Sequence, residues 1–136
     1  MTNTSLFENF DIVYSYTRAQ AIDDGVLVDV SSLAQEAGFI YPVAVTAAVY
    51  DKYIDWTEED NKRQTYQDVK GRLWDILSMM RLQKSRISHS GRFEFMCIPR
   101  GSKSRRVTPI NVTLKALCHG GDKGEPVITV MLPNED

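Results

Sequence analysis

Apolar residues recur at intervals of three and four positions between Thr57 and Gln83, the longest stretch of the chain with a single period. This spacing is typical of a helix with one apolar face. The apolar positions are Tyr66, Val69, Leu73, Ile76, Leu77 and Met80. Thr57 is a suitable N-cap, and the three acidic residues after it lie where the helix dipole favours negative charge. The pattern therefore predicts one long amphipathic helix of about 39 Å.

The C-terminal third has the two-residue period of half-buried strands. Apolar and polar residues alternate in three segments, Arg92–Ile98, Val107–Cys118 and Val127–Leu132. The segments between them, Pro99–Arg106 and His119–Pro126, contain the glycine and serine residues that are typical of hairpin loops. The alternation predicts a three-stranded antiparallel meander, and the long helix is the natural cover for one of its faces.

Shorter elements are predicted in the N-terminal half. Thr17 and Gln20 have the spacing of a capping box, which predicts a helix from Arg18 to Asp23 that ends at Gly25. The run of β-branched residues that follows predicts a short buried strand.

Two further short helices are expected before the long one. Ser31 or Ser32 is expected to cap the helix Leu33–Ala37, and Thr46 to cap the helix Ala47–Ile54. The proline-containing apolar segment between them is interpreted as a loop or an edge strand. The sequence thus predicts an α+β fold: a C-terminal three-stranded antiparallel meander covered by one long helix, with short N-terminal helices and strands.

The chain has 136 residues, which is the size of one domain and enough to bury a core without metal or disulfide bonds. Residues 1–10 are expected to form a loose tail. No apolar run approaches 18 residues, and the first nine residues do not have the pattern of a secretion signal. Two cysteines do not make a disulfide framework. We therefore expect a cytoplasmic protein with reduced thiols and no membrane contact.

Motifs for catalysis or cofactor binding are not found in the sequence. It contains no nucleophile elbow, Walker loop or dinucleotide fingerprint. Cys97, Cys118, His89 and His119 lack the paired spacing of zinc ligands, and both histidines fall in predicted turns. The sequence therefore predicts no catalytic residue, no metal site and no cofactor.

Charge is distributed unevenly along the chain, although the net charge is only −2. Residues 1–80 carry a net charge of −7, whereas residues 81–106 carry a net charge of +7. The basic residues that flank or lie in the first hairpin loop are Arg92, Arg100, Lys103, Arg105 and Arg106. Guanidinium groups match phosphate oxygens bidentately, so these residues are candidates for binding a nucleotide, a nucleic-acid backbone or an acidic protein. The alternative is a solvated hairpin tip whose charges prevent edge-to-edge aggregation.

A second candidate site is the aromatic segment that precedes the first helix. Tyr14 and Tyr16 lie two residues apart and are followed by Arg18. Two rings and a guanidinium group can stack against a planar ligand. The alternative is that one ring packs inward with its hydroxyl group hydrogen-bonded.

Three blocks of the sequence resemble those of one protein family. They are Tyr14–Ser31 (YSYTRAQAIDDGVLVDVS), Phe39–Thr46 (FIYPVAVT) and Gly124–Leu132 (GEPVITVML). They are similar to blocks of an uncharacterised family of small proteins encoded by phages, plasmids and other mobile elements, over about residues 11–132. This chain has Cys118-His-Gly-Gly-Asp122 where family members often have Gly-Pro-Gly-Asp. The resemblance implies an accessory protein of a mobile element and brings no assigned activity.

The functional expectation is a binding protein that contacts a phosphate-bearing ligand or an acidic partner through the basic hairpin loop. Two alternatives stay open. One is an enzyme acting on a nucleotide-like ligand, and the other is a structural protein that forms a homodimer. If the tyrosines and the basic loop lie around one pocket, the ligand and enzyme interpretations gain support.

Overall fold

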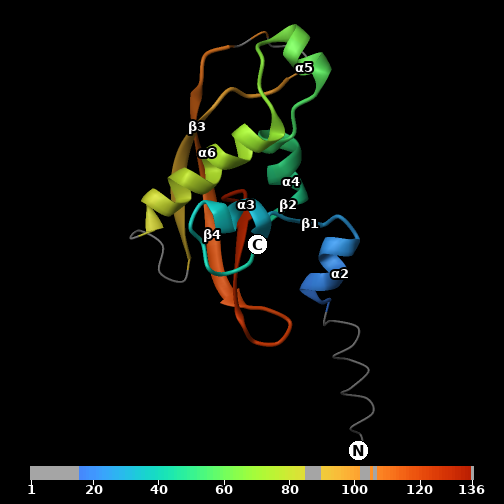
Figure 1. Ribbon diagram of the computed structural model, residues 1–136, viewed down its shortest axis with the longest axis vertical. Helices are drawn as coiled ribbons and strands as arrows, with labels where there is room; N and C mark the ends of the chain where they lie inside the picture. Colours follow the sequence, from blue (N-terminus) through green and yellow to red (C-terminus); the bar gives the residue numbers. More distant parts are fainter. Residues whose placement is uncertain (1–15, 85–89, 102–104, 106, 136) are drawn as a thin grey trace, which may run out of the picture.

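The computed structural model describes residues 16–84, 90–101, 105 and 107–135 of the chain. Helices and strands alternate irregularly along it, and the longest strands come last (Figure 1). In chain order the elements are α2 (Arg18–Asp23), β1 (Leu27–Asp29), α3 (Ser31–Glu36), β2 (Val43–Thr46), α4 (Ala47–Val49), the π-helical turn η1 (Tyr50–Ile54), α5 (Glu58–Arg63), α6 (Val69–Leu82), β3 (Ser90–Cys97), β4 (Ile110–Gly120) and β5 (Pro126–Met131).

The strands form one five-stranded mixed sheet in the order β1-β2-β5-β4-β3. The last three strands pair antiparallel, as their alternation predicts, with Phe93 opposite Leu114 and Ala116 opposite Val130. The prediction was incomplete, because β2 lies parallel to β5 and β1 pairs antiparallel with β2. The meander therefore supplies three of the five strands of a larger sheet, whose other edge comes from the N-terminal half of the chain.

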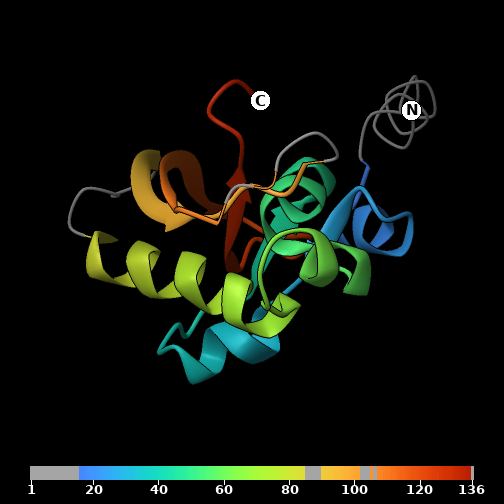
Figure 2. The ribbon, with the colours of Figure 1, turned by 90° about the horizontal axis from the view of Figure 1, so that it is seen from above.

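The core lies between one face of this sheet and helices α3 and α6, which lie on the same side of the strands (Figure 2). Leu73, Ile76, Leu77 and Met80 of α6 are buried, as their spacing predicts. Fully burying such a side chain contributes about 1.5–3 kcal/mol. The helix thereby holds its polar N-terminal half in a defined position over the end of β3.

The long helix predicted over Thr57–Gln83 is in fact two helices, α5 and α6, separated by residues 64–68. Each helix has its own N-cap. Thr57 forms a capping box with Asp60, and Asp68 Oδ1 accepts a hydrogen bond of 2.7 Å from the backbone N–H of Gly71. The period alone missed the second cap, because an aspartate also fits a solvent-facing position within a helix.

The side chain of Asn61, in α5, holds the segment between α5 and α6 in place. Asn61 Oδ1 accepts hydrogen bonds from the backbone N–H of Gln67 at 2.8 Å and from Trp56 Nε1 at 2.7 Å. Tyr66, which the period placed on the apolar face, is 77% exposed. The break sends α5 to the end of the molecule that also holds the loop between β3 and β4 (Figure 1).

The short N-terminal elements agree with their capping signals in two of three cases. Helix α2 begins with the predicted Thr17–Gln20 capping box, and Thr46 caps the helix that continues into η1. Helix α3 differs, because its N-cap is Val30 and neither predicted serine caps it. The Ser31 hydroxyl instead donates to Asp29 Oδ1 at 2.6 Å and accepts from the backbone N–H of Val43 at 3.0 Å. It thereby ties the start of α3 to β2. Of the described helices, none is long and apolar enough to cross a membrane.

Candidate ligand site between helix α6 and strand β3

Arg100 of the basic hairpin is engaged by carboxylates of the protein itself. Its Nη1 lies 3.1 Å from Asp55 Oδ2 and 3.9 Å from Asp51 Oδ1, and its Nε lies 3.1 Å from Asp60 Oδ2. Three-quarters of the side chain is buried. Because these carboxylates already neutralise the charge of Arg100, we leave this residue out of the proposed ligand site.

The other basic residues of the candidate set do not form one cluster in the described structure. Arg92 is exposed on the sheet face opposite α6, directly across from Lys115. It lies five residues before Cys97, or about 16 Å along the strand. Arg105 is exposed, and Lys103 and Arg106 lie outside the described residues. Of the predicted basic set, Arg105 is therefore the exposed residue that the structure describes near the hairpin tip.

In the structure, the described residues of the predicted aromatic site, Tyr16 and Arg18, bind other parts of the protein and do not form a stacking surface for a planar ligand. Tyr14 lies outside the described residues. The Tyr16 hydroxyl donates to Asp24 Oδ2 at 2.5 Å, and this bond raises the pKa of the tyrosine. Arg18 donates from Nη1 to Thr129 Oγ1 at 2.7 Å and from Nη2 to the carbonyl of Ile128 at 2.8 Å. Tyr16 and Arg18 do line a common hollow of about 500 Å³, but the basic hairpin is not part of it.

His119 completes a closed hydrogen-bond set with Arg18 in this hollow. Its Nε2 lies 2.8 Å from Thr129 Oγ1, and its Nδ1 lies 3.1 Å from the carbonyl of Gly120. Because a carbonyl only accepts, Nδ1 carries the proton, and the Thr129 hydroxyl donates to Nε2 while it accepts from Arg18. His119 is the second-to-last residue of strand β4, whereas the sequence predicted that it lies in a turn. Burial lowers the pKa of Arg18, against the opposing effect of nearby carboxylates. The set serves to fasten α2 to the sheet.

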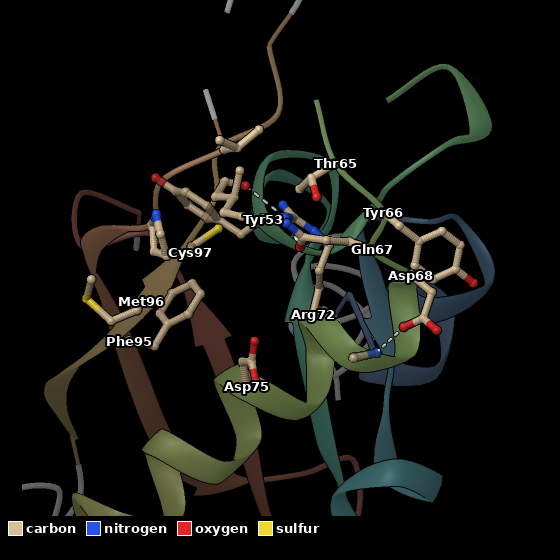
Figure 3. Close-up of a pocket in the computed structure, with 14 residues that line it drawn as sticks. Tyr53, Thr65, Tyr66, Gln67, Asp68, Arg72, Asp75, Phe95, Met96 and Cys97 are labelled. Atoms are coloured by element: carbon tan, nitrogen blue, oxygen red, sulfur yellow. Dashed lines mark hydrogen bonds between the residues drawn. The ribbon is translucent and has the colours of Figure 1, made fainter. Parts of the chain in front are cut away.

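A different pocket, of about 520 Å³, lies where α6, η1 and the end of β3 meet (Figure 3). The segment between α5 and α6 forms one wall, and Ile98, Val107 and Pro109 at the base of the basic hairpin form another. Tyr53 and Phe95 form a third wall, with their rings edge to face at 5.9 Å between centroids. Polar groups from α6 project into the space between these walls.

Arg72 is the most unusual of these polar groups, because it is only 4% exposed. Its Nη1 donates to Gln67 Oε1 at 3.0 Å and to the carbonyl of Ile98 at 2.8 Å, and its Nε donates to the carbonyl of Ile54 at 3.2 Å. The guanidinium group also stacks on Trp56, 4.5 Å from the ring centroid. Among the described residues Nη2 has no hydrogen-bond partner. Burial lowers the pKa of Arg72.

Two titratable groups lie close to this guanidinium. Asp75 projects into the pocket one turn further along α6 (Figure 3), where partial burial raises its pKa and the charge of Arg72 opposes the rise. Burial likewise raises the pKa of the Cys97 thiol, again against Arg72, so the thiol stays protonated at neutral pH. Across the described residues there is no group of three or more histidine, cysteine, aspartate or glutamate side chains placed to hold a metal ion.

Arg72 was not among the residues that the sequence predicted to bind a ligand, although a signal was present. Arg72 lies three residues after Val69 and four before Ile76, which puts it within the apolar stripe of the helix. A charged residue on a face that packs against a sheet must be satisfied inside the protein or by a ligand. Its hydrogen-bond partners, from residues 54, 67 and 98, come from separate parts of the chain and carry no local pattern.

The fold and the site together define a small α+β protein with a mixed five-stranded sheet and a polar pocket built around a buried arginine. The chain belongs to the family described as "Family of unknown function (DUF6573)", whose sequence profile covers residues 1–136. This agrees with the resemblance to a family of unassigned activity. No curated protein and no solved structure matches the chain.

Proposed function

We propose that this protein is a non-catalytic binding protein that holds a phosphate-bearing ligand, such as a nucleotide, in the pocket between α6 and β3. Arg72 is the anchor, and the base of the hairpin, at Ile98, Val107 and Pro109, is the rim of the site. In the cellular setting that the sequence resemblance implies, this is an accessory protein of a mobile genetic element, acting in the cytoplasm. The observation that carries the proposal is the buried Nη2 of Arg72: in the described part of the protein it has no oxygen or nitrogen acceptor, and the Cys97 thiol that adjoins the guanidinium group accepts only weakly.

The electrostatics of Arg72 favour a ligand. A guanidinium group has five N–H donors, and here its hydrogen-bond acceptors are two carbonyls and one amide oxygen, none of them charged. Leaving a buried donor unpaired is unfavourable by about 1–3 kcal/mol, and more for a charged group. Because Nη2 is fully buried, an anionic oxygen reaches it from the pocket only when a lining side chain moves aside, and it then removes this penalty and adds a charge-assisted hydrogen bond.

The charges around the pocket suggest how such a ligand is oriented. Asp68 and Asp75 both line the pocket and repel a phosphate group on the α6 side. Arg105 lies in the segment that joins the lining residues Ile98 and Val107, on the hairpin side. We therefore place the phosphate toward the hairpin and a planar, hydrogen-bonding body toward α6. There the Asp75 carboxylate accepts from N–H groups, as it would from a nucleobase.

The aromatic wall supports a planar body in this position. Tyr53 and Phe95 meet edge to face, so one of the two rings can offer its flat side to a ligand while the other holds it in place. Stacking of a base on an aromatic side chain is worth about 1–3 kcal/mol. Binding rather than catalysis is favoured because the thiol nearest Arg72 is kept protonated by burial.

The test is calorimetric titration with ATP, GTP, their monophosphates and inorganic phosphate, at low and at high salt. We expect a nucleotide to bind and Arg72→Lys to weaken binding about 10- to 100-fold, because one charge-assisted hydrogen bond is worth about 1.5–3 kcal/mol. Asp75→Asn is expected to change the preference among bases. Circular dichroism checks that each variant is folded.

Arg105→Ala and Arg92→Ala form a matched pair, because each removes one arginine from the surface and only the first lies near the pocket. We expect Arg105→Ala alone to weaken binding. Equal effects of the two changes would indicate non-specific attraction and contradict the proposal, as would a wild-type protein that binds none of the ligands. Release of product during the titration would instead favour an enzyme acting on a nucleotide-like ligand.

A further inference from the structure

A second cavity, of about 320 Å³, lies at the opposite end of α6. Its walls come from the loop after α3, the last turn of α6 and the middle of the sheet, and it shares no lining residue with the pocket around Arg72. Phe39, Met80, Ala116 and Ile128 make its interior apolar. Its volume and lining fall within the range of small-molecule sites in proteins.

The charge around this cavity has a single sign. Among the described residues, Arg81 and Lys84 are the only charged side chains that line it, and both are exposed. In the part of the chain that the structure describes, neither Arg81 nor Lys84 forms an ion pair with a carboxylate. Arg81 Nη1 donates to the carbonyl of Ala37 at 3.0 Å. An apolar interior with two unneutralised cations at one edge is complementary to a molecule with an apolar body and one anionic end.

Gly38 allows Arg81 to occupy this edge. The residue has a φ of +103°, and a Cβ atom there would lie 1.8 Å from Arg81 Nη1. Only glycine therefore combines this backbone conformation with so close an approach of the guanidinium group. The hydrogen bond to the carbonyl of Ala37 places the guanidinium group of Arg81 at the mouth of the cavity.

We propose that this cavity binds a small amphipathic carboxylate, with its hydrocarbon chain inside and its carboxylate group between Arg81 and Lys84. The size favours a small molecule over a protein partner. An α-helix with its side chains is about 10–12 Å across and needs more room than the volume of about 320 Å³ found here. Ile40, which is 87% exposed at the rim, adds apolar surface that a bound chain covers.

The experiment uses decanoate as the probe and the full-length protein. A fluorescent anilinonaphthalene sulfonate is bound first and is then displaced by decanoate or by decanol, which has the same chain length without the charge. We expect decanoate to displace the dye at lower concentration than decanol. Lys84→Glu is expected to weaken decanoate about fivefold or more, since an exposed ion pair contributes up to about 1 kcal/mol.

Lys70→Glu is the matched control, because Lys70 is exposed on the same helix and does not line the cavity. It is expected to leave decanoate binding unchanged. Equal weakening by both variants, or equal displacement by decanol and decanoate, overturns the assignment of a carboxylate site.

The thiol of Cys118 supplies an independent readout, because it lines the cavity and is partly exposed while Cys97 is buried. Bound decanoate is expected to slow the reaction of Cys118 with a thiol reagent, and Cys118→Trp, which fills the space, is expected to abolish dye displacement. Unchanged Cys118 reactivity overturns the proposal. A concentration-dependent dimer in light scattering that Cys118→Trp disrupts would assign the cavity to a second copy of the chain instead.

Discussion

Replacement of Asp60 by asparagine tests whether Arg100 has a structural role. Asp60 is 7% exposed, and its Oδ2 accepts from the Thr57 backbone N–H at 2.9 Å, from the Thr57 hydroxyl at 3.0 Å and from Arg100 Nε at 3.1 Å. The asparagine side chain would keep an oxygen for the cap and lose only the charge. We expect Asp60→Asn to lower the free energy of unfolding by about 1.5–3 kcal/mol at pH 7, the worth of a hydrogen bond to a charged group. The value stays below that of a fully broken buried ion pair, because Arg100 keeps Asp55 at 3.1 Å.

The pKa shift of Asp60 determines how the stability difference between the wild type and Asp60→Asn changes with pH. Burial by itself raises the pKa of Asp60, but the hydrogen bonds from Thr57 and the charge of Arg100 outweigh it, so the pKa is lowered in the folded protein. A carboxyl group with a lowered folded pKa stabilises the fold above its unfolded pKa of about 3.9, and this contribution is lost as the pH falls through the folded pKa. The difference between the wild type and Asp60→Asn is therefore expected to shrink below about pH 4.

Urea denaturation at a series of pH values measures this difference directly, with the midpoint and the slope fitted separately. A double-mutant cycle with Arg100→Ala isolates the pairwise contribution, which we expect to be about 0.5–3 kcal/mol. A difference that stays constant from about pH 7 to about pH 3, on either side of the carboxyl pKa, or a coupling energy of zero, would refute the assignment of Arg100 to this cluster. It would then return Arg100 to the set of candidate ligand contacts.

Three further changes test other parts of the structure. Gly38→Ala is expected to destabilise the protein by more than Gly25→Ala, because its φ of +103° lies further than +78° from the left-handed region and its Cβ would displace the Arg81 guanidinium from the carbonyl of Ala37; urea midpoints of the two variants decide this. Thr17→Ala removes the capping box of α2 and is expected to lower stability by about 1 kcal/mol, or a few degrees in the melting temperature. Leu77→Ala empties a fully buried position and is expected to lower stability by about 2–5 kcal/mol, so an effect below about 1 kcal/mol would contradict the packing of α6 on the sheet.

Local features of the fold could be predicted well from the sequence. The alternation in the C-terminal third predicts three paired strands, and the caps at Thr17 and Thr46 begin helices as expected. The break between α5 and α6 was missed because the cap at Asp68 competes with a helical pattern that runs through it. The assignment of β2 to the same sheet was missed because a parallel pair joins strands about 85 residues apart without any turn signal between them.

The candidate site was predictable only in part. Positive charge in the hairpin is visible in the composition, but its distribution over separate surfaces is not. Arg100 is neutralised by residues 40 to 49 positions away, and Arg92 faces the opposite side of the sheet from α6. The pocket around Arg72 depends on hydrogen bonds to the carbonyls of Ile54 and Ile98, 18 and 26 residues away, which no spacing rule in the sequence encodes.

By itself, the sequence determined most of the helical and extended segments, because capping and periodicity depend on side chains within about four residues of each other; it did not show the break between α5 and α6 or that β2 is an inner strand of the sheet. Only the tertiary structure decided which charges are free. Arg100 lies in the basic part of the chain, residues 81–106, and Arg72 lies in the acidic part before it. Folding surrounds one with carboxylates and leaves the other with only neutral acceptors. Whether a charge is available to a ligand depends on the groups that the fold brings within about 4 Å of it, and those groups come from anywhere in the chain.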